Sequence, residues 1–331
     1  MDPLSQGVLG AAAPQALARN ELKWAGLLGF LAGMSADLDV LIRSQTDPLL
    51  FLEFHRQFTH ALVFIPFGGL ICACVLYFLF ARRRLSFRAT YLYCTLGYAT
   101  HGLLDSCTSY GTQLLWPFSN ARFAWHSISI IDPLFTVPLL AGVLLSARSG
   151  RRVWARAALL WIAIYLSLGF FQRDRAESFG QNFAATRGHT GARVEAKPAF
   201  GTLLLWKTIY EFEGKYFVDA VRLGLTTTHY AGQSVPKLKL ARDFPWLDPS
   251  SQQARDIERF RWFSAGYLAL SATHDDTIID MRYSMLPHRV DGLWGVVLSR
   301  HAGVGEHVKF LSLRNADEAT RHQLAAMILG D

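Results

Sequence analysis

Charged side chains are missing from residues 61–81 of this 331-residue chain. This uncharged run of 21 residues is long enough to cross a bilayer, whose hydrocarbon core needs about 20 mostly apolar residues. Such runs are rare in soluble folds. The sequence therefore favours a membrane protein over a soluble bundle of buried helices.

Cysteine is also scarce. The four cysteines, Cys72, Cys74, Cys94 and Cys107, lie in or beside apolar blocks, and residues 172–331 contain none. The second half of the chain therefore has no disulfide framework. Internal repeats, a glycine-rich phosphate loop and a nucleophile elbow are missing as well. These absences give no support to a P-loop nucleotidase or to a hydrolase that uses such an elbow.

Five apolar blocks are candidates to span a membrane: residues 22–42, 61–81, 90–109, 127–147 and 154–171. A weakly apolar segment before them, in which Asp2 can cap a helix that starts at Pro3, would make a sixth. Residues 172–331 carry 20 Lys and Arg against 18 Asp and Glu, the mixed charge of a soluble domain. We therefore predict a membrane α-helical bundle of five or six spans over residues 1–171, followed by a soluble α+β domain over residues 172–331.

The basic residues lie between the apolar blocks, not on an aromatic-rich patch. The net charge of +7 therefore indicates membrane orientation and gives no sign of nucleic-acid binding. Lys and Arg accumulate on the cytoplasmic side of membrane proteins. Two clusters define that side here: Arg82, Arg83, Arg84 and Arg88, and Arg148, Arg151, Arg152 and Arg156. We expect residues 172–331 to lie outside the cytoplasm.

The block at residues 22–42 has a second interpretation. Basic residues, a short apolar run and the sequence Met34-Ser35-Ala36 resemble a cleaved secretory signal. Cleavage there would leave Asp37 on the external side, as in the first interpretation.

With this orientation, the apolar blocks carry their ionisable side chains at one, external membrane face: Asp37 and Asp39, His55 and His60, His101 and Asp105, and Asp132. Ionisable residues within spans are costly and usually mark functional sites. Taken singly, each of these residues is more often a helix cap or a solvated side chain. Their shared face favours a common site.

The spacing of these residues indicates a metal site. His101 and Asp105 are four residues apart and lie on one face of a helix. His55 and His60 can converge if a helix begins between them, with Thr59 as its N-cap. A mixed set of imidazoles and carboxylates suits a divalent ion such as zinc, manganese or iron, and zinc is our first choice. The predicted ligands are Asp37, His55, His60, His101 and Asp105.

Further roles can be assigned to the remaining polar residues. Several carboxylates can bridge two metals that activate water. Asp39 or Asp132 would be the catalytic base. Arg56 or Arg122 would bind an anionic group of the substrate, although each also suits an interfacial anchor.

Residues 1–145 resemble the YdjM family of membrane-bound proteins, described as metal-dependent hydrolases, LexA-binding and inner-membrane-associated. The resemblance rests on four stretches: MSADLDVLI, FHRQFTHALVFIPFGG, GYATHGLLDSCTSYGTQLLWPFS and SIIDPLF. They match the family motifs D-x-D, H-R-x-x-T-H, H-x-x-x-D and W-P-F. The resemblance implies a multi-pass protein of the bacterial cytoplasmic (inner) membrane. We do not carry over LexA binding, because LexA is cytoplasmic and the predicted site faces outward.

The chain departs from this family at its start. Many relatives have Thr-His there, where this chain has Gln6. Asp2 or Gln6 would take the place of that histidine.

The soluble domain has an α+β pattern. Residues 203–211 and 216–223 alternate around Glu213-Gly214 and predict a hairpin. Further strands are expected at residues 277–285, 294–299 and 307–313, and helices at residues 252–271 and 316–329. The run His274-Asp275-Asp276 is interpreted as a solvated loop. This domain would cover the site or select substrate.

Two functions remain in contention. The first is a metal-dependent hydrolase that cleaves an ester or phosphoester of lipid or envelope material, with membrane lipids around it and a lipid or small molecule as substrate. The second is a non-catalytic metal-binding membrane protein or partner-binding scaffold. A transporter is less favoured, because the polar residues gather at one face and not at the midplane. The sequence leaves the oligomeric state open.

Overall fold

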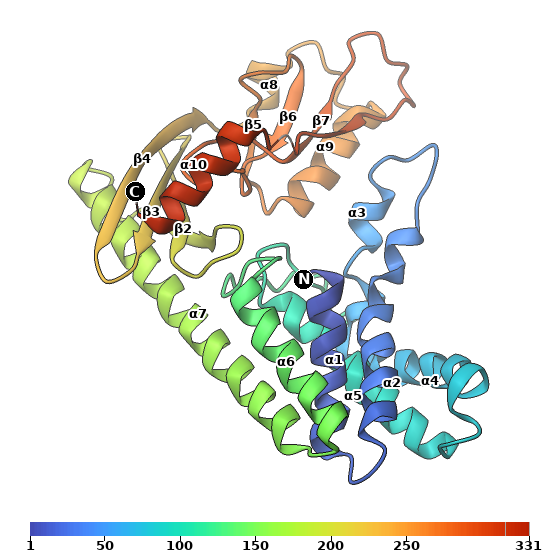
Figure 1. Ribbon diagram of the computed structural model, residues 1–331. Coiled ribbons are helices and arrows are strands. Elements are labelled where there is room, and N and C mark those ends of the chain that lie inside the picture. Colours follow the sequence, from blue (N-terminus) through green and yellow to red (C-terminus); the bar gives the residue numbers. More distant parts are fainter. Residues whose placement is uncertain (315, 331) are drawn as a thin grey trace. The chain divides into compact units, whose positions relative to one another are not determined.

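The computed structural model describes residues 1–314 and 316–330 (Figure 1). The chain forms two compact units. The first comprises Met1–Leu41, Phe54–Phe171 and Phe200–Thr202, and the second comprises Ile42–Glu53, Gln172–Ala199 and Leu203–Asp331.

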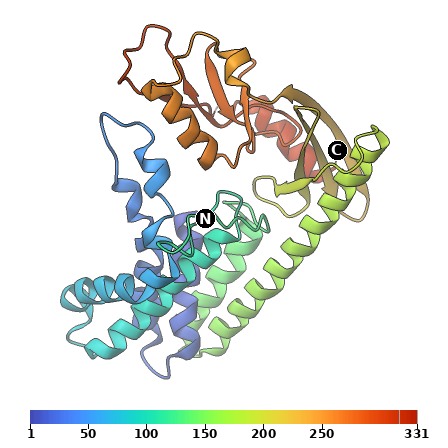
Figure 2. The same cartoon turned by 180° about the vertical axis from the view of Figure 1, so that it is seen from behind.

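The first unit is helical. In chain order it contains α1 (Pro3–Leu17), α2 (Leu22–Ser35), η1 (Ala36–Leu41), η2 (Phe58–His60), η3 (Leu62–Phe64), α4 (Ile65–Leu76), η4 (Tyr77–Ala81), α5 (Phe87–Ser106), α6 (Pro133–Ser149) and the first part of α7 (Val153–Thr186). Helices α1, α2, α5 and α6 pack side by side (Figures 1 and 2).

Aspartate side chains cap the starts of two of these helices. The Asp2 carboxylate accepts a hydrogen bond from the Ser5 backbone nitrogen at 3.0 Å, and Pro3 follows it, so the predicted N-terminal helix is confirmed. Asp132 caps α6 in the same way, ahead of Pro133. The helix expected over residues 127–147 therefore begins only at Pro133, because this Asp-Pro pair starts it.

Glycines allow three helices to approach closely. A Cβ added to Gly10 of α1 would lie 2.8 Å from the Cα of Gly33 in α2, and one added to Gly97 of α5 would lie 2.7 Å from the Cα of Gly29. Gly29 and Gly33 are four residues apart and share one face of α2. This small-residue spacing brings helix backbones together in membranes, and here it brings α2 against both α1 and α5.

Three helical segments are long and apolar enough to cross a membrane: Leu22–Leu41, Leu62–Ala81 and Val153–Thr186. The segment Leu62–Ala81 exposes large apolar side chains, including Phe67, Phe78 and Leu79 at 59%, 65% and 66%. Exposed apolar surface of this extent marks an interaction with another apolar phase. The predicted count of five or six spans stays a prediction.

Helix α7 is much longer than the span expected at residues 154–171. It continues without interruption to Thr186. Proline is missing from the whole of Val153–Thr186, so no residue there lacks the backbone donor that a helix interior needs. The change from apolar to polar composition after Phe171 therefore ends the apolar run but not the helix.

The second unit contains two four-stranded antiparallel sheets, ordered β1-β2-β3-β4 and β5-β6-β7-β8. The strands are β1 (Glu195–Pro198), β2 (Leu205–Phe212), β3 (Lys215–Leu223), β4 (Thr227–Pro236), β5 (Leu268–Leu270), β6 (Thr277–Asp280), β7 (Trp294–Val297) and β8 (Lys309–Ser312). The helices are most of α3 (Leu50–Phe54), the end of α7, α8 (Leu240–Asp243), α9 (Gln252–Phe263) and α10 (Glu318–Leu329). Ile209 and Val218 of the first sheet share a core with Ala269 and Ile279 of the second.

The hairpin predicted around Glu213-Gly214 is confirmed as β2 and β3. Both turn residues have positive φ, at 48° and 71°, as the tight turn of a two-residue hairpin requires. The helix predicted over residues 252–271 was too long. It ends at Phe263 because Ala265 and Gly266 take positive φ, and the chain then enters β5, which pairs with β6.

The close approach of α1 and α2 can be tested at Gly29. Gly29→Ala should destabilise the helical unit, although alanine favours a helix by about 0.8–1.0 kcal/mol over glycine. The added Cβ would lie 2.5 Å from Pro14 Cγ and closer still to the Gly10 carbonyl oxygen, and such overpacking costs about 1–3 kcal/mol. We expect a lower midpoint of thermal unfolding in detergent. Leu27→Ala, at a 43% exposed position of the same helix, is the control and should unfold close to the wild type. Equal midpoints for all three proteins would contradict this packing.

Candidate metal centre

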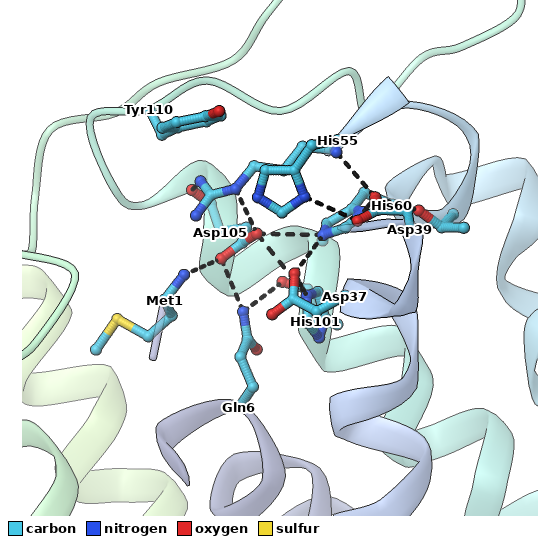
Figure 3. Close-up of polar contacts among 12 residues, drawn as sticks. Met1, Gln6, Asp37, Asp39, His55, His60, His101, Asp105 and Tyr110 are labelled. Carbon is cyan, nitrogen blue, oxygen red and sulfur yellow. Dashed lines mark hydrogen bonds and ion pairs between the residues drawn. The ribbon is translucent and has the colours of Figure 1, made fainter. Parts of the chain in front are cut away.

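Four side chains from three parts of the first unit converge on one point (Figure 3). His101 and Asp105 lie one turn apart near the end of α5, as their spacing predicts. Asp37 reaches them from η1, directly after α2, and His60 comes from η2. One donor atom from each of the four lies within 4.8 Å of the others.

The donor atoms are spaced as metal ligands. Nε2 of His60 lies 3.4 Å from Asp37 Oδ1 and 3.3 Å from Asp105 Oδ2. Nε2 of His101 lies 3.3 Å from the same Asp37 oxygen and 3.8 Å from the same Asp105 oxygen. Tetrahedral ligands about 2.0–2.1 Å from a zinc ion would be roughly 3.3–3.4 Å apart. The four atoms therefore match the dimensions of a small coordination shell.

Three of these atoms lack a hydrogen bond. Within the described part of the chain, His60 Nε2, His101 Nε2 and Asp105 Oδ2 are buried and make ion-pair contacts but no hydrogen bond. Buried polar atoms are almost always paired, because an unpaired one loses its contact with water without compensation. Three such atoms facing one another fit a shared cation.

Other contacts fix the two imidazole rings. Nδ1 of His101 lies 2.5 Å from the Gly33 carbonyl oxygen. A carbonyl only accepts, so Nδ1 carries the proton and Nε2 presents its lone pair to the cluster. His60 is held by Thr59, whose hydroxyl is 2.9 Å from His60 Nδ1 and donates to Asp39 Oδ2 at 2.8 Å. The prediction that Thr59 caps a helix was wrong, because its hydroxyl is used by this carboxylate and this ring.

Negative charge dominates the centre. Three carboxylates, those of Asp37, Asp39 and Asp105, surround His60. Burial lowers the pKa of His60, but its contacts with these carboxylates more than offset this and raise the pKa to about 10. A potential that holds a proton so strongly also favours a divalent cation at the same place.

Arg56 supplies a positive charge beside this cluster. Its Nε lies 2.9 Å from Asp105 Oδ2, although the two are not aligned as a hydrogen bond. Its Nη1 donates to the Thr108 hydroxyl at 2.9 Å, and only 4% of the residue is exposed. The other Asp105 oxygen accepts hydrogen bonds from the Met1 amine and, at 2.8 Å, from Gln6 Nε2. Gln6, considered above in place of the relatives' histidine, therefore contacts the centre through Asp105.

Asp39 and His55 form a hydrogen-bonded pair at the edge of the cluster. Oδ1 of Asp39 lies 2.8 Å from His55 Nδ1, and Oδ2 accepts hydrogen bonds from the Arg56 backbone nitrogen and from Thr59. The His55 side chain is 18% exposed, whereas Asp39 is buried. Asp37, Asp39 and His55 also form a second group with metal-ligand spacing, but the hydrogen bonds to Asp39 already engage both of its oxygens.

The two remaining predicted site residues have other contacts. Asp132 caps α6 and accepts hydrogen bonds from the Tyr165 hydroxyl at 2.9 Å. Arg122 donates to the carbonyl oxygen of Gly111 at 2.9 Å and lies over the Tyr110 ring. The structure does not bring Asp132 into either of the two groups with metal-ligand spacing. The roles assigned to both residues stay predictions.

Gly33, Thr59 and Tyr98 position the centre through contacts that the sequence did not predict. The Gly33 carbonyl orients His101, the Thr59 hydroxyl links His60 to Asp39, and Tyr98 donates to the Thr59 carbonyl at 2.7 Å. Every residue has a backbone carbonyl, so a contact that uses one cannot be recognised from residue types. The small-residue spacing of Gly29 and Gly33 was the one signal that α2 lies against another helix here.

Comparison with known proteins supports the likeness of the helical unit to a membrane family. The sequence pattern of the YdjM inner membrane protein family matches residues 1–176. The chain is 28% identical over 118 residues to the uncharacterized protein YfhP of Bacillus subtilis, which covers 35% of each chain. It is 36% identical over 108 residues to the inner membrane protein YbcI of Escherichia coli, which covers 31% of this chain and 60% of YbcI.

These matches have defined limits. The chain spans about a third of YfhP and about three fifths of YbcI. No solved structure matches the chain significantly. The family pattern covers more than half of the chain, including all the residues of the candidate metal centre. The chain therefore belongs to the YdjM family of inner membrane proteins.

Proposed function

We propose that this protein is a membrane-bound metal-dependent hydrolase that cleaves an ester or phosphoester of lipid or envelope material. The observation that carries the proposal is a set of three buried side-chain atoms, on His60, His101 and Asp105, that face one another and make no hydrogen bond. With Asp37 they would hold one divalent cation. Zinc is the first choice, because imidazole and carboxylate ligands without thiolates are typical of catalytic zinc sites.

A cation held there would supply Lewis acidity, which makes water a nucleophile near neutral pH. The protein's own groups would move the proton. Asp39 holds Nδ1 of His55, so His55 Nε2 presents its lone pair and can take a proton from the attacking water. The water oxygen bonds to the carbon or phosphorus centre, the ester bond breaks, and His55 returns the proton to the leaving oxygen. Asp39, the base in the sequence analysis, would thus act through His55.

The accessible edge of the centre fits this assignment. The side chains of Asp37 and His55 are 23% and 18% exposed, while those of His60, His101 and Asp105 are buried. A substrate would therefore approach past Asp37 and His55. Arg56 contacts Asp105 and Thr108, and it would balance the carboxylate charge more readily than bind a substrate group.

A non-catalytic role is the second candidate. Its supporting observation is the burial of three of the four ligands, because structural metal sites are closed to solvent and substrate. In that case the cation would join α2, η2 and α5 and contribute stability alone.

We also propose the membrane arrangement that the arginine clusters predict. The chain would cross the bacterial cytoplasmic membrane five or six times, with residues 172–331 on the external side. The end of α5, which carries His101 and Asp105, and η1, which carries Asp37, would then face outward.

Metal content tests the centre. Wild-type protein purified in detergent without chelators should contain about one divalent transition metal per chain, and His101→Ala and His60→Ala should lose it, because each removes a ligand lone pair. His274→Ala, in the soluble unit, is the matched histidine control and should keep it. Elemental analysis measures all four. A metal-free wild type would overturn the centre, and two metals per chain would add the group formed by Asp37, Asp39 and His55.

Hydrolysis tests the catalytic role separately. His55→Gln should retain metal yet lower kcat about 10²–10⁴-fold, the usual contribution of a positioned general base. His322→Gln, at a side chain that is 78% exposed, is the control and should not differ from the wild type. A panel of chromogenic esters, phosphomonoesters and phosphodiesters supplies the measurement. Metal-loaded wild type without activity on the panel or on membrane lipids would favour the structural role.

A reporter fusion tests the orientation. A fluorescent protein that matures only in the cytoplasm should stay dark when fused after Asp331, because the positive-inside rule places that end outside. The same reporter fused after Arg84, in the first arginine cluster, should be bright. Bright fluorescence from the fusion after Asp331 would contradict the external position of residues 172–331, and a dark fusion after Arg84 would contradict the outward-facing centre.

A further inference from the structure

An apolar groove runs between α2 and α4 beside the metal centre. It encloses about 430 Å³, within the roughly 300–1,000 Å³ of small-molecule sites. Its walls include Leu31 of α2 and Ile71, Val75 and Leu76 of α4. Ile71 and Val75 are 58% and 52% exposed, so the groove is open along the outer side of α4. We call it the α2–α4 groove.

The groove lies between two segments that qualify as membrane spans, Leu22–Leu41 and Leu62–Ala81. Along α4 it extends from Gly68 to Leu76, which is about 12 Å at 1.5 Å per residue. One leaflet contributes half of a hydrocarbon core about 30 Å thick. The groove is therefore long enough to hold most of the acyl chain that lies within a single leaflet.

One end of the groove reaches the metal centre. Thr59 contributes to the lining, and the same side chain donates to Asp39 and contacts His60 Nδ1. Tyr98 also lines the groove and donates to the Thr59 carbonyl oxygen. An apolar channel thus ends at the residues that orient a predicted metal ligand. Such a site matches a molecule with an apolar chain at one end and a polar, reacting group at the other.

Resting on the proposed hydrolase function, we infer that the α2–α4 groove binds the acyl chain of a membrane lipid and places its headgroup ester or phosphoester at the metal centre. The lipid enters sideways from the bilayer, because the open side of the groove lies along α4. Substrate selection then depends on chain length as well as on the headgroup.

A matched pair of variants on α4 tests this inference. Ile71→Trp fills the groove, whereas Leu70→Trp adds the same bulk at a neighbouring position that is 42% exposed and does not line the groove. The full-length protein is placed in phosphatidylethanolamine and phosphatidylglycerol vesicles that contain a phospholipid with a photoreactive acyl chain. Mass spectrometry then locates the labelled residues.

In the wild type, labelling at Leu31 and Val75 should exceed labelling at Phe67, a 59% exposed residue of α4 that does not line the groove, at least five-fold. Ile71→Trp should reduce this enrichment to the level at Phe67, and Leu70→Trp should preserve it. Equal labelling of groove and non-groove residues in the wild type would overturn the inference. So would an enrichment that Ile71→Trp leaves unchanged.

A chain-length series separates this inference from the proposed function. Ile71→Trp should slow hydrolysis of dodecyl-chain substrates at least ten-fold and leave that of the matching methyl substrates unchanged, with Leu70→Trp unaffected on both. Wild-type activity that does not depend on chain length would contradict acyl-chain binding in the groove and would leave the hydrolase proposal unaffected. Enriched labelling without hydrolysis of any substrate would support acyl-chain binding and remove the hydrolase.

Discussion

The backbone contact of α2 with α1 and α5 is the constraint on which the metal-ligand cluster depends. Gly29 and Gly33 present a surface without side chains, so the Gly33 carbonyl reaches the His101 ring at 2.5 Å. The same approach sets the end of α2 beside α5, where Asp37 meets His101. In a bilayer the hydrophobic effect does not drive helices together, so close packing of small residues has to supply the association. The arrangement of the metal-ligand cluster therefore depends on the lack of side chains at Gly29 and Gly33.

Charge balance explains why the polar residues are collected and not spread. A lone buried carboxylate in an apolar setting is very costly, whereas one held by hydrogen bonds and opposite charge is tolerated. Each carboxylate here has such partners: Asp105 has Arg56 and Gln6, and Asp39 has Thr59 and His55. The atoms of His60, His101 and Asp105 that face the centre are buried without a hydrogen bond. The surrounding contacts thus support a cluster that could hold a metal ion, beside a groove that is largely apolar.

The sequence predicted those features of the fold and of the site that depend on local periodicity and on charge. Helical spacing placed His101 and Asp105 together, and the side of the membrane inferred from the arginine clusters brought Asp37 and His60 to them. What depends on distant partners was not predictable. Thr59 has the composition of a helix cap, but Asp39, twenty residues earlier, uses its hydroxyl. The predicted helix ran past the end of α9 because Leu268–Leu270 pair with β6 as a strand, and this distant partner cannot be read from local periodicity.

Segment Ile42–Glu53 has a consequence for biosynthesis. It joins Asp39 to His55, yet it belongs to the second unit, where Asp47 pairs with Arg259 at 2.7 Å. Arg259 lies 212 residues later in the chain. At about 5–20 residues per second, the ribosome needs roughly 10–40 s to reach it. The loop between two residues of the centre therefore lacks this ion pair until Arg259, in the second unit, has been synthesised. The ligands are made early in translation, and the segment that connects them gains this contact much later.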